Sequence, residues 1–218
     1  MSEGMHTLRT SENNIISLEG VVKGLVSENS RVEKIYKNVD FSVGGLPISV
    51  EELNSLKEIK KNGIEPEYFM STPEIAYAQN LKRFGDVEIP PPSYMGFIDH
   101  CDTRDIPIHA IDMDDDHYTM AYCKHVSGSN WIMQSFMEKR LLKKSIDAEN
   151  PVDFALKWDA KINRLSGFQA LEKNREEVMA KNLERLSRKG NVFSIVEVER
   201  LEGIANKLLS SNCTILER

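Results

Sequence analysis

The segment from 112 to 117 is rich in side chains that can bind metal ions or exchange protons, and four of them form a candidate site. Asp112, Asp114 and Asp116 alternate along the chain, and His117 follows them directly. Carboxylate oxygens and an imidazole nitrogen are ligands for a divalent metal, which polarises water for hydrolysis. The spacing lacks the glycine and the distal glutamate of a calcium-binding loop. The same composition is typical of a helix N-terminus, where aspartates meet unpaired backbone amides, and we favour that interpretation.

Charged residues also end two β-branched stretches that are far apart in the sequence. Lys23 follows the first stretch, and Glu197, Glu199 and Arg200 end the second. Lys23 and Arg200 at one edge of a sheet would form a cationic pocket suited to a carboxylate or phosphate. An ion-paired network and solvated charges at a helix start remain alternatives. The ligand-binding candidates are therefore Lys23, Asp114, Glu197, Glu199 and Arg200.

Strands and helices that could position these residues alternate along the chain after a polar leader of about 14 residues. Short apolar or β-branched runs predict strands over residues 14–22, 40–43, 106–112 and 191–198, the second ending at a Gly-Gly pair. Apolar residues at helical spacing predict helices over residues 27–38, 50–60 (closed by Gly63), 72–83, 93–105, 119–126, 131–144, 151–165, 169–188 and 202–210. This alternation predicts an α/β fold with a mostly parallel or mixed sheet flanked by helices and a helical insertion in the C-terminal half.

Length and composition limit the domain count and the classes of partner. The chain has 218 residues, so we predict a single domain over 1–218 with a helix-rich segment at about 119–188. The net charge is −6 and Lys and Arg are interleaved with Glu, which argues against a nucleic-acid partner. No apolar run is long enough to span a membrane. The N-terminus has no secretion signal and the three cysteines have no paired spacing, which favours a cytoplasmic location.

Three stretches resemble the TraB/PrgY family, which shares a superfamily with the Tiki proteases and the ChaN-like haem-binding proteins. Residues 92–125 contain I-P-I-H-A-I-D-M-D-D-D-H, which is similar to a family strand that ends in I-D-R-D. Residues 174–204 contain N-R-E-E-V-M-A-K-N-L-E-R-L, a strand and L-E-G-I, and resemble the helix, strand and terminal G-x-G-H-x-x-G-I signature of the family. Residues 26–30, V-S-E-N-S, are similar to the V-S-E-x-S that follows its G-T-x-H motif. The resemblance runs in order along most of the chain and is weakest over residues 47–90.

The positions at which this family carries its metal chemistry hold other residues here. In chain order, the differences are Lys23 or Leu25 for the first histidine, Gly45 for a glutamate, Met113 for an arginine, Glu197 and Glu199 for two glycines, and Arg200 for the last histidine. Arginine stays protonated and has no lone pair to offer a metal ion. The resemblance therefore implies a TraB-like scaffold, a degenerate member in which the inherited metal site is dismantled.

For intact family members, the resemblance implies action on peptide signals and metal-dependent peptide hydrolysis. Without those residues, we expect a non-catalytic binding or regulatory protein for a peptide or small anionic ligand, with no cofactor. One alternative is a peptidase-like hydrolase that holds a divalent metal in a rearranged site around Asp112–His117. Another is a structural subunit of a homo-oligomer such as a homodimer. Trp131, Met133, Phe136 and Met137 are compatible with such an interface, and equally with a core stripe.

Overall fold

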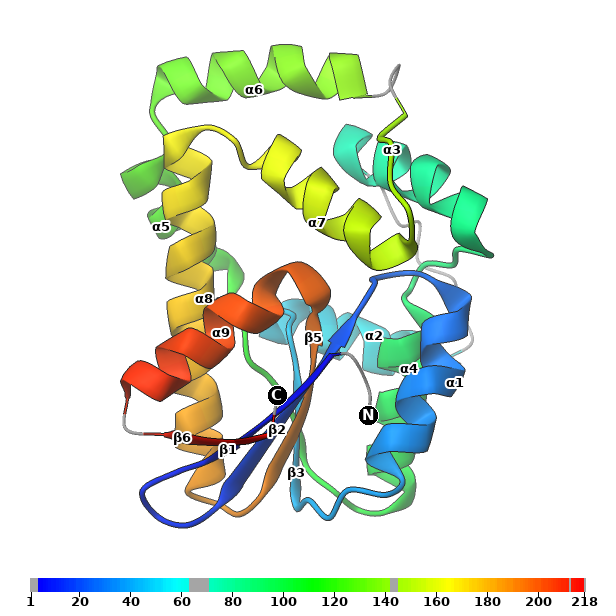
Figure 1. The fold of residues 1–218 in the computed structure, drawn as a ribbon, viewed down its shortest axis with the longest axis vertical. Helices are drawn as coiled ribbons and strands as arrows, with labels where there is room; N and C mark the ends of the chain where they lie inside the picture. Colours follow the sequence, from blue (N-terminus) through cyan, green and yellow to red (C-terminus); the bar gives the residue numbers. More distant parts are fainter. Residues whose placement is uncertain (1–3, 63–70, 142–144, 212, 218) are drawn as a thin grey trace.

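The computed structural model describes residues 4–62, 71–141, 145–211 and 213–217, which form an α/β fold built on a central sheet (Figure 1). Its strands are Met5–Arg9 (β1), Ile15–Val21 (β2), Val43–Leu46 (β3), Ile108–Ala110 (β4), Val192–Glu197 (β5) and Thr214–Glu217 (β6). The strand order is β4-β3-β5-β2-β1-β6. The first four strands of this order run parallel, whereas β1 pairs with both β2 and β6 in antiparallel fashion. The predicted fold class, a mostly parallel or mixed sheet flanked by helices, is confirmed.

Helices connect these strands and account for most of the described chain. They are Val26–Tyr36 (α1), Val50–Asn62 (α2), Thr72–Leu81 (α3), Pro92–Thr103 (α4), Asp115–His125 (α5), Gly128–Leu141 (α6), Pro151–Ile162 (α7), Ser166–Ser187 (α8) and Val198–Ser210 (α9), with a short 3-10 turn at Lys82–Phe84. Each predicted helix is present with shifted ends, and α5 to α8 form the predicted helical insertion. The predicted ends at Gly63 and residue 144 lie outside the described residues. No described helix is both long and apolar enough to cross a membrane.

Helices cover both faces of the sheet (Figure 1). On one face, α8 and α9 bury residues such as Leu183 and Ile204 against Ile16 of β2. On the other face, α1, α2 and α4 pack around aromatic residues that include Phe97 of α4 and Phe193 of β5. Both clusters are fully enclosed and dominated by aliphatic and aromatic side chains. Their burial is the main favourable term that holds the strand ends in fixed positions.

A separate group of helices stands beyond the carboxyl ends of the parallel strands. α3, α6 and α7 contact one another there, and α7 also contacts α9 (Figure 1). Phe154 and Trp158 of α7 pack with Leu81 of α3, and Val22 and Leu25 extend this cluster from the end of β2. We call α3, α6 and α7 the cap. The apolar contacts at Val22 and Leu25 fix the cap against the edge of the sheet.

The antiparallel strands β1 and β6 occupy segments for which no strand is predicted. β1 lies inside the predicted polar leader, and only His6 and Leu8 of its five residues are buried. All four residues of β6 are exposed. A strand near the edge of a sheet buries few side chains, so its sequence shows little of the apolar alternation on which the prediction depends.

β3 continues through the two glycines at which the second strand is predicted to end, so that boundary is wrong. A Cβ on Gly44 would lie 3.0 Å from the Cys101 sulfur, and one on Gly45 would lie 2.8 Å from the Ser194 hydroxyl. The glycines therefore permit close packing of β3 against α4 and β5 instead of making a turn. For the same reason, Gly45, at which the resemblance would place a glutamate, has no room for a larger side chain unless Ser194 moves.

Candidate functional site

A cavity of about 390 Å³ lies between the carboxyl ends of the parallel strands and the cap. In sheets of this type, ligands bind at this edge because the loops and helix N-termini there are free to differ between proteins. The volume is within the range of small-molecule sites. Its charged lining consists of Lys23, Glu74, Asp159, Glu172, Arg175, Glu197, Glu199 and Arg200, and its aromatic lining consists of Tyr77, Tyr118 and Trp158.

The strand ends place four of the five predicted ligand-binding residues in this cavity. β2 and β5 are parallel neighbours, with Val21 opposite Glu197, so the residues that follow them meet at one edge. Lys23 Nζ lies 3.5 Å from Glu197 Oε1. α9 begins directly after β5 without a loop, and this places Glu199 and Arg200 in its first turn at the cavity wall. The sequence therefore brings together the group that was predicted to converge.

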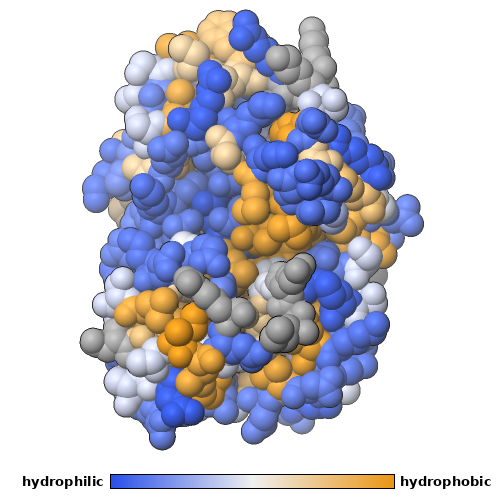
Figure 2. Space-filling model, in the orientation of Figure 1, coloured by the Kyte–Doolittle hydropathy of each residue, from blue (hydrophilic) through white to orange (hydrophobic). Residues whose placement is uncertain are grey.

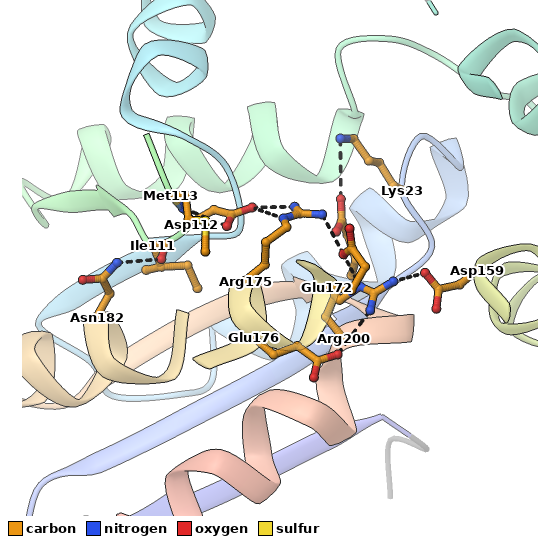
Figure 3. Close-up of polar contacts among 11 residues, drawn as sticks. Lys23, Ile111, Asp112, Met113, Asp159, Glu172, Arg175, Glu176, Asn182 and Arg200 are labelled. Carbon is orange, nitrogen blue, oxygen red and sulfur yellow. Dashed lines mark hydrogen bonds and ion pairs between the residues drawn. The ribbon is translucent and has the colours of Figure 1, made fainter. Parts of the chain in front are cut away.

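Arg175 of α8 joins the cavity to the end of β4. Its Nε donates to Asp112 Oδ2 at 3.0 Å and its Nη1 donates to Glu172 Oε2 at 2.8 Å (Figure 3). Burial raises the pKa of Glu172, although the Arg175 guanidinium opposes that shift. Asn182, one of the residues further along α8, donates to the Ile111 carbonyl at 2.8 Å. These contacts hold the chain at Ile111 and Asp112 against α8, so Asp112 takes part in a structural ion pair.

Arg200, on α9, is surrounded by acids from two other helices, α7 and α8. Its guanidinium pairs with Asp159 of α7 and, through Nη1 at 3.2 Å, with Glu176 of α8 (Figure 3). Its Nε lies 3.4 Å from Glu172. The side chain is only 7% exposed, so the charge is stabilised mainly by these partners. Arg200 therefore connects the cap to both helices on one face of the sheet.

Glu199 has the most perturbed carboxyl group of the cavity. Burial, and then the neighbouring Glu197 carboxylate, raise its pKa to about 8. Its Oε2 atom is enclosed and has no hydrogen-bond partner within the described part of the chain, and the same holds for the hydroxyls of Tyr77 and Tyr94. Burial also raises the pKa of both tyrosines, and Glu199 contributes to each shift. Buried polar atoms without partners are uncommon and mark places where water or a ligand group completes the hydrogen bonding.

Acidic side chains outnumber basic ones in the cavity, whereas a cationic pocket was predicted. Five acidic and three basic side chains line it, and each of the three bases lies against at least one of these acids. Lys23 and Arg200 do share the cavity, as predicted, but Glu197 and Asp159 neutralise them. An incoming anion would have to displace these carboxylates. The pocket is therefore acid-rich. Helices α7 and α8 contribute carboxylates to it, and the sequence alone does not show that these helices pack at this edge of the sheet.

The remaining candidate, Asp114, lies away from this cavity. It caps α5, where its carboxylate accepts from the His117 backbone amide at 2.8 Å and contacts the His117 ring at 2.7 Å. The amide hydrogen bond lowers the pKa of Asp114. The favoured interpretation of a helix N-terminus is confirmed for this residue.

The structure does not bring Asp112, Asp114, Asp116 and His117 together as a ligand set. Asp112 points to Arg175, and the Asp114 carboxylate is engaged with the backbone at the N-terminus of α5. Nowhere in the described ranges do three His, Cys, Asp or Glu side chains gather so as to hold a metal ion. The rearranged hydrolase site around Asp112–His117 therefore lacks the convergent geometry that a metal centre needs.

Several cavity residues carry no signal in the sequence. Glu172 and Arg175 belong to a charge-rich helix, and such a pattern is typical of a solvated face, yet Glu172 is buried. Asp159 and Tyr77 come from helices of the cap, and where those helices pack depends on tertiary contacts that the sequence pattern does not show. The spacing of Glu172 and Arg175 as an i,i+3 pair was visible, but such pairs are common on exposed helices.

No model of a known protein family matches this chain, and no curated protein matches it significantly. The chemistry of the cavity is therefore the basis on which its function is inferred.

Proposed function

We propose that this protein is a non-catalytic binding or regulatory protein whose ligand, a peptide or another small polar molecule, occupies the cavity beneath the cap. One observation carries the proposal: a cavity of about 390 Å³ at the carboxyl edge of the sheet has fixed charges and aromatic rings on its walls. Such a combination of apolar surface and a few oriented polar groups is typical of ligand sites.

The similarity to the TraB/PrgY family supports the peptide as a ligand class and the absence of catalysis. In the resemblance, Arg200 and either Lys23 or Leu25 stand where the family pattern has histidines. Lys23 and Arg200 are both engaged in ion pairs with acids. A lysine or arginine held in this way cannot bind a metal ion. A small anion is the less suitable ligand, because the bases it would need already have carboxylate partners.

A blocking substitution tests the proposal. Ala78 lines the cavity from α3, whereas the next residue, Gln79, is exposed. We expect random tetrapeptides to raise the unfolding temperature of the wild-type chain and of Gln79→Trp but not of Ala78→Trp, whose indole fills the cavity. Ligand at a hundredfold excess over Kd adds about 2.7 kcal/mol to the free energy of unfolding. For a chain of this size this corresponds to a shift of roughly 5–10 °C.

The measurement is thermal unfolding with and without the peptide mixture, with bound peptides identified by mass spectrometry after gel filtration. Equal shifts for wild type and Ala78→Trp would place the binding elsewhere and contradict the proposal. Peptide cleavage by the wild-type chain, lost on removal of metal by a chelator, would replace it with the hydrolase alternative.

A second candidate function, a structural subunit of a homo-oligomer, is favoured by the surface of α6. Trp131, Ile132, Met133 and Phe136 are all exposed on this helix. Apolar side chains lie among polar ones on the part of the molecule that α6 forms, at the top of Figure 2. Clustered exposed apolar residues of this size mark interaction surfaces more often than free surface.

A further inference from the structure

We infer that the ligand of the cavity carries a primary ammonium group, which Glu199 and its neighbouring acids bind. This inference rests on the proposed function, because it names the chemistry of the ligand for the same cavity. The ammonium group can belong to the N-terminus of a peptide or to a free amine, and the experiment below separates these two sources.

The bases of the cavity are already bound by acids. Arg175 holds Asp112 and Glu172, and Arg200 holds Asp159. Removing a partner from a buried pair leaves an uncompensated charge and costs several kcal/mol. An anionic group would have to do this to pair with Arg175 or Arg200, whereas a cationic group would not.

One acid of the cavity, Glu199, still lacks a donor for one of its oxygens in the described part of the chain. Glu199 lines the cavity, and its enclosed Oε2 has no hydrogen-bond partner within the described residues. The nearby Tyr77 hydroxyl also lacks a partner there. An ammonium group brings three N–H donors and no acceptor. The last torsion of a glutamate is soft, so a small rotation of the carboxyl group would turn an oxygen toward such a donor.

Aromatic rings form part of the cavity wall beside Glu199. The rings of Tyr77 and Trp158 lie edge to face with centroids 5.6 Å apart, and both line the cavity beside Glu199. Aromatic faces attract cations and repel anions through their quadrupole. The carboxylates and the rings therefore favour the same sign of ligand charge.

Binding of a cation at this place also requires that Glu199 lose its proton. The titratable and charged groups that face it are Glu197 and Lys23 at the strand ends, Glu172 of α8, Tyr77 of α3 and Tyr94 of α4, with Arg200 next to it on α9. Burial and Glu197 keep Glu199 mostly protonated at pH 7, because its pKa is about 8. A ligand ammonium stabilises the carboxylate, so the proton is released to solvent as the ligand binds.

The probes are two pairs of compounds, and the members of each pair are of similar size. The first pair is tetrapeptides with a free N-terminus and the same tetrapeptides N-acetylated; the second is 1,4-diaminobutane and butyrate. Affinity is measured by isothermal titration calorimetry at pH 6 and pH 7. We expect binding of the compounds that carry an ammonium group and none of the acetylated peptides or butyrate. Apparent affinity should rise about tenfold from pH 6 to pH 7, because the competent carboxylate form becomes about ten times more populated.

Variants test the role of Glu199 directly. We expect Glu199→Gln to weaken binding of the ammonium compounds at least about tenfold and to remove the pH dependence, because an amide cannot carry the negative charge. Titration in two buffers of different ionisation enthalpy should detect release of about one proton by the wild-type chain and none by Glu199→Gln. Glu177→Gln, an exposed glutamate of α8, serves as the control and should behave as wild type. Tyr77→Phe, which removes a hydroxyl without a partner in the described chain, provides a second site variant and should also weaken binding.

The outcomes separate the inference from the function on which it rests. If acetylated peptides or butyrate bind as well as the ammonium compounds, and Ala78→Trp blocks them, the cavity is a binding site but the ammonium inference is wrong. If only 1,4-diaminobutane binds, the inference stands with a free amine as the source and the peptide proposal fails. If no compound binds, both are overturned. Binding that Glu199→Gln and Tyr77→Phe leave unchanged also overturns the inference.

Discussion

At the scale of single residues, Glu199 should make the stability of the chain depend on pH. Its pKa rises from 4.5 to about 8 on folding, chiefly through burial. Between these values the folded protein holds a proton that the unfolded chain releases. The free energy of unfolding that Glu199 contributes is therefore fully present below about pH 4.5 and is lost as the pH rises towards 8.

Glu199→Gln should remove this dependence, because glutamine does not titrate. We expect the variant to be close to wild type at pH 5 and more stable than wild type at pH 8, as measured by urea unfolding at both values. Comparison with the variant cancels the contributions of Glu172 and other buried acids, whose pKa values are also raised. A difference in stability that stays constant between pH 5 and pH 8 would contradict the shifted pKa.

Single residues of the site were predictable where strand order decides their position. Lys23, Glu197, Glu199 and Arg200 follow two recognisable strands, and parallel neighbours end at one edge. The sign of the pocket was not predictable. It depends on carboxylates such as Asp159 that arrive through the packing of helices, and helix packing follows from three-dimensional contacts that a sequence pattern does not reveal.

At the scale of secondary-structure elements, Arg200 should determine how firmly α7 and α8 are held against α9. It is the shared partner of Asp159 and of two α8 glutamates, Glu172 and Glu176. We expect Arg200→Met to lower the free energy of unfolding by about 3 kcal/mol, because the acids lose their counter-charge inside the protein. The loss should be smaller at pH 5, where protonation relieves the unpaired acids. Urea unfolding and hydrogen exchange of α7 amides measure these two effects.

The matched control for this substitution is Arg188→Met. Arg188 is the exposed residue that follows α8, and its change should alter stability by less than about 0.5 kcal/mol. The ion pairs contribute nothing to docking of the cap if Arg200→Met lowers the free energy of unfolding no more than the control does. The same conclusion follows if the amide hydrogens of α7 exchange no faster than in wild type.

The elements themselves were predictable to different degrees, for physical reasons. Long helices with buried stripes, such as α8 and α9, leave a clear periodic signal. β6 does not, because all of its residues are exposed. The predicted start of α9 is four residues late, since Val198 continues the apolar run of β5 and only the structure shows that the backbone turns into a helix there.

At the scale of the whole molecule, the sheet with its flanking helices and the cap are joined at the rim of the cavity. The apolar cluster around Phe154 and Trp158 continues from the cap to Val22 at the end of β2. Ion pairs of Arg200 add a polar connection between the same parts. A ligand in the cavity would touch both, so its binding should stabilise the cap and the sheet together.

The outer side of the cap makes a prediction about assembly. Trp131 is 59% exposed and Phe136 is 65% exposed, whereas Gln134 and Met137 of the same helix are buried. α6 thus directs large apolar side chains outward as well as inward. Association of two copies through this helix would remove that surface from water, and each fully buried large apolar side chain contributes about 1.5–3 kcal/mol.

We therefore expect the wild-type chain to form dimers at micromolar concentration and the double variant Trp131→Ser, Phe136→Ser to remain monomeric. Light scattering coupled to gel filtration over a range of concentrations measures the mass directly. Arg140→Ser, an exposed polar change on the same helix, should leave the dimer intact because it removes no apolar surface. A wild-type chain that is monomeric throughout would refute self-association through α6. If the double variant still dimerises, the interface lies on another surface, because the variant lacks the apolar area of α6.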